Sequence, residues 1–95
     1  MIHITLNENK VHIEGHTEST ICSSISSIMY TSVNALLGWD EKSITYIDDC
    51  FHDYVEITMV RNLGITKFLF ENMKKCFKQI AEQYPDCVKI TESVQ

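Results

Sequence analysis

No charged side chain occurs between Glu18 and Asp40, so this segment is long and uncharged enough to be a candidate for a transmembrane helix or for a helix packed within a domain. Its apolar residues recur every three or four positions, the spacing of one face of an α-helix. The predicted buried face comprises Ile21, Ile25, Ile28, Met29, Ser32, Val33 and Leu36. Ser19 or Thr20 is expected to cap the helix start, and Gly38 is expected to end it. The many Ser, Thr and Asn residues favour a helix packed within a domain over a transmembrane helix.

A second helical pattern begins after Gly64 and stops before Pro85. Apolar residues again recur at helical spacing, and the charged residues of the segment occupy the other side. The predicted buried face comprises Ile65, Phe68, Leu69, Met73, Cys76, Phe77, Ile80 and Tyr84. A helix is therefore expected over residues 65–84.

Alternating apolar and polar residues predict strands before, between and after the two helices. The predicted strands cover residues 2–6, 11–14, 44–47, 52–60 and 87–90, with turns at 7–10 and at 48–49. Gly15 is expected to end the second strand. The resulting order is ββα-ββα-β, which favours an α+β fold with a mostly antiparallel sheet and two helices on its face. Residues 1–95 are expected to form a single domain.

The net charge of −5 argues against nucleic-acid binding, because phosphate contacts require clustered Lys and Arg side chains. The only basic cluster, Lys74, Lys75 and Lys78, lies on the polar side of the second helix and is interpreted as a solvated surface. We therefore expect neither a nucleic acid nor a membrane as a partner.

The chain contains four cysteines, Cys22, Cys50, Cys76 and Cys87. The N-terminus resembles a strand rather than a secretory signal, so free thiols and a cytoplasmic location are expected. Cys50 lies two residues from His52, but no second pair of ligands at zinc-site spacing accompanies them. No metal and no other cofactor is therefore expected.

Cys22 lies where the first helix begins, and His16 lies six residues earlier. The dipoles of a helix N-terminus and a nearby imidazole both favour a reactive thiolate. In such a pair the imidazole removes the thiol proton and later protonates the leaving amine. Free backbone N–H groups in the first helical turn are expected to stabilise an oxyanion. Ser26 follows Cys22 on the same helix face.

The segment from Gly15 to Gly38 resembles the ribosomal-processing cysteine protease family, Prp. That family has a Gly-His pair after a strand, an Asp-Ile-Val-Cys-like tetrapeptide opening a helix, a Ser four residues after the Cys, and a later Ser-Val-Asn-Ala run. The matching residues of this chain, in the same order, are Gly15-His16, Ile21-Cys22, Ser26 and Ser32-Val33-Asn34-Ala35. The ββα-ββα-β order also resembles the layout of the family.

The resemblance implies a cysteine endopeptidase in which Cys22 is the nucleophile, His16 is the base and Ser26 supports the site. The implied substrates are proteins: a large-subunit ribosomal protein carrying an N-terminal extension, or the capsid and scaffold proteins of phages. It also implies a homodimer, for which the uncharged first helix offers a surface.

Two departures from the family pattern bear on activity. The family's acidic residue, three positions before the Cys, is Ser19 here, and the adjacent Glu18 is the candidate replacement. The loop between His16 and Cys22 is also about half the family's usual length. The alternative interpretation is a non-catalytic, homodimeric protein-binding module with the same fold.

Overall fold

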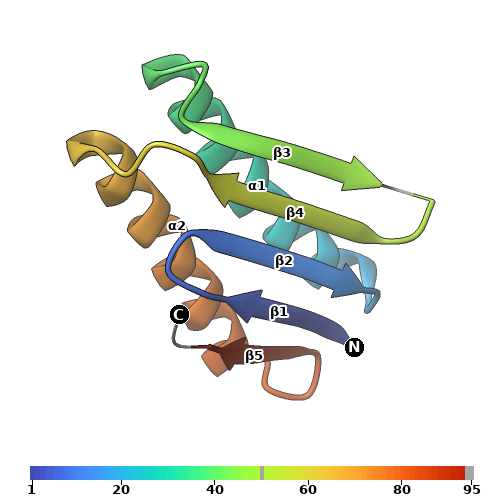
Figure 1. The fold of residues 1–95 in the computed structure, drawn as a ribbon. Helices are drawn as coiled ribbons and strands as arrows, with labels where there is room; N and C mark the ends of the chain where they lie inside the picture. Colours follow the sequence, from blue (N-terminus) through green and yellow to red (C-terminus); the bar gives the residue numbers. More distant parts are fainter. Residues whose placement is uncertain (50, 94–95) are drawn as a thin grey trace.

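A computed structural model describes residues 1–49 and 51–93. Five strands and two helices follow in the order ββα-ββα-β, which confirms the predicted α+β class (Figure 1). The elements are β1 (Ile2–Leu6), β2 (Lys10–Gly15), α1 (Ser19–Trp39), β3 (Ile44–Asp49), β4 (Tyr54–Met59), α2 (Gly64–Gln83) and β5 (Val88–Glu92).

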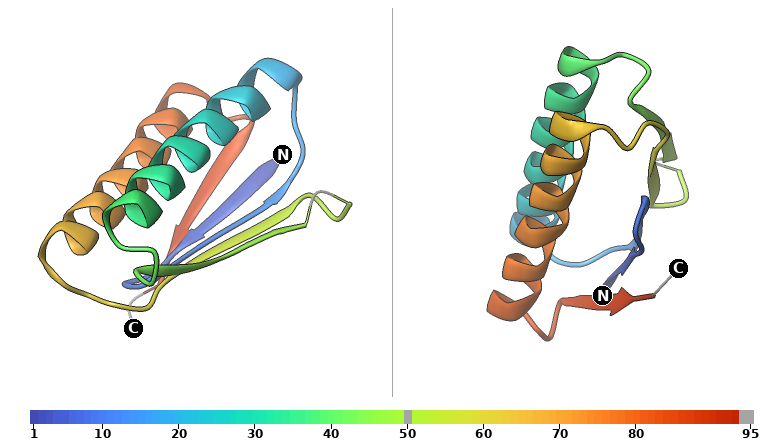
Figure 2. Two further views of the ribbon diagram at one scale, coloured as in Figure 1. Left: turned by 90° about the horizontal axis from the view of Figure 1, so that it is seen from above. Right: turned by 60° about the vertical axis from the view of Figure 1, so that its left-hand side comes forward.

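The strands form one sheet in the order β3-β4-β2-β1-β5. Three pairs are antiparallel and β5 lies parallel to β1, so the sheet is mixed. This pairing makes each helix a crossover between two parallel strands, α1 from β2 to β3 and α2 from β4 to β5. β2 and β4, from which the two crossovers start, are antiparallel, and the crossovers run toward opposite edges of the sheet. If both crossovers are right-handed, as is usual, these two differences cancel and the helices lie on the same face of the sheet. Accordingly, both helices cover one face of the sheet (Figure 2).

The core lies between this face and the two helices. Its sheet residues alternate along each strand, and cross-strand partners such as Ile4 and Ile13, or Val11 and Ile57, point to the helices together. The opposite face of the sheet has no helix over it and presents mainly polar side chains, His12 and Glu56 among them. The pattern of alternation that predicted the strands therefore also marks the buried face.

The first helix buries Ile21, Ile25, Met29, Val33 and Leu36, all of which belong to the predicted face. By length and composition alone α1 is a candidate membrane span, with a mean hydropathy of 1.2. In this fold its buried residues belong to the same core cluster as the strands.

The predicted caps of α1 are wrong at both ends. The N-cap residue is Glu18, and no side chain accepts a capping hydrogen bond from the first turn, so neither Ser19 nor Thr20 caps the helix. At the other end the helix continues through Gly38 to Trp39. Its C-terminus closes through two donors to the Leu36 carbonyl, the backbone N–H of Asp40 and the buried Ser43 hydroxyl, each at 3.0 Å. Tertiary contacts thus replace the glycine cap.

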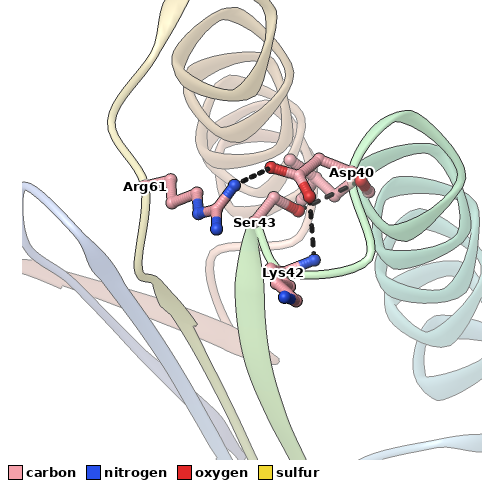
Figure 3. A network of polar contacts seen from close by, with 5 residues as sticks. Asp40, Lys42, Ser43 and Arg61 are labelled. Carbon is pink, nitrogen blue, oxygen red and sulfur yellow. Dashed lines mark hydrogen bonds and ion pairs between the residues drawn. The ribbon is translucent and has the colours of Figure 1, made fainter.

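The Asp40 carboxylate fixes the connection from α1 to β3 (Figure 3). It accepts a hydrogen bond from the backbone N–H of Lys42 at 3.0 Å and pairs with Arg61 at 3.4 Å. Since Arg61 follows β4, this contact ties the end of α1 to the β3–β4 pair.

The buried face of α2 differs from the predicted one. Thr66, Phe70, Met73 and Phe77 are buried, whereas Ile65 and Phe68 are 45% and 68% exposed. Apolar residues occupy a wide arc of this helix, so their periodicity does not show whether Leu69 or the adjacent Phe70 points into the core. In the packed fold the larger Phe70 is completely buried.

Smaller corrections concern Cys76, which is half-buried rather than part of the core, and the strand ends. Asp48 and Asp49, predicted as a turn, continue β3 and pair with Val55 and Tyr54. The last strand begins one residue later than predicted, after Cys87.

Candidate functional site

A short connection of residues 16–18 leads from β2 into α1, and its path is set by Gly15. This residue has a φ of +104°, and a Cβ built on it would lie 2.3 Å from the Met1 carbonyl oxygen. The N-terminal ammonium of Met1 donates to the His16 carbonyl at 2.7 Å. The start of β1 therefore packs against the Gly-His pair, where only a residue without a Cβ fits.

Gly15→Ala is expected to destabilise the fold by at least about 2 kcal/mol, because it combines an unfavourable φ with a backbone clash. It should also lower any activity that depends on His16, the next residue. Urea unfolding monitored by circular dichroism measures the first effect. Gly38→Ala is the matched control: a Cβ there meets nothing within 4 Å, and a gain of about 0.5–1 kcal/mol is expected. Equal unfolding midpoints for Gly15→Ala and the wild type would contradict this account.

Cys22 lies in the first turn of α1 and is half-buried. Its thiol donates to the Thr17 carbonyl at 3.3 Å, and its backbone N–H donates to the Glu18 carbonyl at 3.0 Å. Ile21 N–H also donates to Glu18. In the first turn, the backbone N–H groups of Ser19 and Thr20 are not used in the helix's own hydrogen bonds, so these two are the donors available to an oxyanion.

Cys22 and His16 line the same cleft, which has a volume of about 320 Å³. Ser26, one turn further along α1, lines it as well, so three of the candidate site residues meet in one cavity. Glu18 and Ser19 are exposed and are not among the residues that line the cleft. In Figure 1, α1 begins beside the end of β2, at the end of the sheet where β3 also ends.

The cleft also contains two residues that no sequence motif marks as functional, Tyr30 on α1 and Asp48 on β3. The Tyr30 hydroxyl donates to Oδ2 of Asp48 at 3.0 Å, so the contact bridges helix and sheet. Tyr46 donates to the same oxygen at 3.0 Å. Burial of Tyr46, followed by its hydrogen bond to Asp48, raises the pKa of the Tyr46 hydroxyl above its ordinary value. The Tyr46 hydroxyl therefore keeps its proton and donates this hydrogen bond to Asp48.

The cleft has an apolar floor and an acidic rim. Ile13, Ile25 and Met29 contribute to the floor, while Asp48 and Asp53 are its carboxylates. Among the described residues that line it, none is Lys or Arg. This arrangement favours a ligand with apolar groups and a positive charge.

The described ranges, 1–49 and 51–93, contain no group of three His, Cys, Asp or Glu side chains placed to hold a metal ion. Cys22, Cys76 and Cys87 are free thiols. Cys50, and with it the Cys50–His52 pair, lies outside the described residues.

Comparison with known proteins identifies similar sequences and folds. The family model for the cysteine protease Prp matches residues 1–89. The fold is similar to that of the essential ribosomal processing protease Prp from S. aureus in complex with a substrate peptide, with a TM-score of 0.89 and 19% identity over 98% of this chain and 100% of that chain. The same protease with a covalently linked product peptide has a TM-score of 0.88 at the same identity and coverage.

SMU.848 from Streptococcus mutans is also similar, with a TM-score of 0.89 and 22% identity over 100% of this chain and 96% of that chain. A search of curated proteins found no match.

Proposed function

Because this chain belongs to the cysteine protease Prp family, we propose that it is a cysteine endopeptidase with Cys22 as nucleophile and His16 as base. The family match confirms the resemblance first found over residues 15–38. The observation that carries the proposal is that Cys22 and His16, which correspond to the family's Cys and His, line one cleft. The solved relatives that contain peptides support a polypeptide as the substrate.

In the proposed reaction the Cys22 thiol turns from the Thr17 carbonyl toward His16, which takes its proton. The sulfur attacks the scissile carbonyl, and the backbone N–H groups at the start of α1 stabilise the negative oxygen that forms. The C–N bond then breaks as His16 returns the proton to the amine, leaving a thioester on Cys22. Water attacks the thioester carbonyl while His16 takes its proton. The C–S bond then breaks, the carboxyl product leaves, and His16 returns the proton to the Cys22 sulfur. The Ser26 hydroxyl, one turn from the sulfur, supports the site.

The substrates proposed from the family are a large-subunit ribosomal protein with an N-terminal extension and the capsid or scaffold proteins of phages. Each recombinant candidate is incubated with the protein, and intact masses are recorded against a sample without it. A product shortened by one discrete segment identifies the substrate and the cut. If every candidate keeps its full mass, the proposed substrates are wrong.

One observation favours a second function, that of a non-catalytic binding module. The Cys22 thiol donates to a backbone carbonyl within the short loop, so its proton is held away from a base. A module binds a candidate protein and leaves its mass unchanged, whereas an endopeptidase shortens it. Pull-down of the same candidates followed by mass spectrometry therefore separates the two functions.

We also propose that the protein acts in the cytoplasm as a homodimer. The exposed side of α1 between Ser23 and Leu37 carries no charge, so another chain can cover it without burying an unpaired ion. Sedimentation velocity is expected to give the mass of two chains. A single-chain mass at high concentration contradicts the dimer and leaves the catalytic proposal intact.

A further inference from the structure

The cleft extends well beyond Cys22 along one face of α1. Cys22, Ser26 and Tyr30 follow at four-residue intervals, and all three line it. Tyr30 lies eight positions after Cys22 in the helix, which corresponds to about 12 Å along the helix axis. An extended peptide advances about 3.3 Å per residue, so about four residues of substrate fit between the nucleophile and Tyr30.

The group that a substrate meets at that distance is the Asp48 carboxylate. Oδ2 of Asp48 accepts hydrogen bonds from the hydroxyls of Tyr30 and Tyr46, both at 3.0 Å. Two donors on one oxygen fix the orientation of the carboxylate. Asp48 takes part in none of the ion pairs found within residues 1–49 and 51–93, and no Lys or Arg lines the cleft around it.

We propose that Asp48 is a specificity-determining residue that binds a Lys or Arg side chain of the substrate, about four residues from the scissile bond. The proposal rests on the endopeptidase function above and adds the class of sequence that the cleft selects. A basic side chain gains a charge-assisted hydrogen bond from a carboxylate already held in place. An acidic side chain at that position meets the Asp48 carboxylate and is repelled.

The alternative role for Asp48 is structural, because its contact with Tyr30 ties β3 to α1. The two roles have different consequences. Loss of a structural tie slows the cleavage of all substrates to a similar degree. Loss of a charge selector slows only the cleavage of substrates with a basic residue at the selected position.

The test is a synthetic library of randomised, cysteine-free peptides, in which the cleaved sequences are read by mass spectrometry. With the wild type, Lys and Arg are expected to be enriched about tenfold at one position near the fourth residue from the cut. Asp48→Asn keeps a hydrogen-bond acceptor but removes the charge, and this enrichment should disappear. Asp48→Lys should replace it with enrichment of Asp and Glu at the same position.

Glu8→Gln is the matched control, since Glu8 lies in the β1–β2 turn at the opposite end of β2 from the cleft, and it should keep the wild-type preference. The inference is overturned if the wild type cleaves without preferring a basic residue, or if Asp48→Asn keeps the preference. A wild type that cleaves no peptide overturns the proposed function itself and this inference with it. A uniform loss over all sequences in Asp48→Asn assigns Asp48 the structural role and also overturns the inference.

Discussion

Cys22→Ala is expected to abolish peptide cleavage, with a loss of roughly 10⁴-fold or more in kcat, because no other group replaces the attacking sulfur. The fold should persist. The side chain is half-buried, and its one hydrogen bond is a weak thiol contact with the Thr17 carbonyl. Turnover of the peptide library measures the activity, and urea unfolding measures the stability.

Cys76→Ala is the matched control for this variant. Cys76 is also a free, half-buried cysteine on a helix, but it lies on α2 and is not among the residues that line the cleft. It should cleave at the wild-type rate. Cleavage by Cys22→Ala at a rate comparable to that of Cys76→Ala would remove Cys22 as the nucleophile.

His16→Ala should lower kcat by about 10²- to 10⁴-fold, the usual contribution of a general base. KM should change little, because the apolar floor and the Asp48 end of the cleft remain in place. The Gly15 backbone is unaffected by the substitution, and the Met1 ammonium contacts the His16 carbonyl rather than its ring. The loss is therefore expected in the chemical step, and steady-state kinetics separates it from binding.

His3→Ala tests whether the effect is particular to position 16. His3 is exposed on β1, and its side chain lies on the sheet face opposite the helices. This variant should retain the wild-type kcat and KM. If His16→Ala instead raises KM and leaves kcat unchanged, His16 is a substrate contact and not a base.

Local sequence patterns predicted most of this fold because each element carries its own periodicity. The alternation in β1 and β2 and the spacing of Ile21, Ile25 and Met29 depend only on which side of the element is buried. The errors occur where contacts with another segment of the chain determine the end or the buried face of an element. The end of α1 depends on Ser43, which is buried against the Leu36 carbonyl, and the face of α2 depends on which aromatic residue reaches the sheet.

The candidate site likewise has a part that the local sequence predicts and a part that depends on tertiary structure. Gly15, His16, Cys22 and Ser26 lie within one short stretch of sequence, so the local spacing and the resemblance to the Prp family predict them as site residues. All four line the cleft. The acidic end was missed because β3 reaches it through tertiary structure. The sequence predicts a turn at Asp48, whereas its position beside Tyr30 follows from the crossover of α1 over the sheet. The spacing of Tyr30 from Cys22 was the only signal in the sequence.

The most direct test of the central claim measures how fast each thiol reacts with iodoacetamide at neutral pH, by peptide mapping of the alkylated chain. Under the proposed mechanism Cys22 should react at least about tenfold faster than Cys76, because a catalytic cysteine reacts faster with electrophiles than a structural one. In His16→Ala this advantage should shrink while the Cys76 rate stays constant. If Cys22 reacts no faster than Cys76 in the wild type, Cys22 is not an activated nucleophile and the proteolytic account is contradicted.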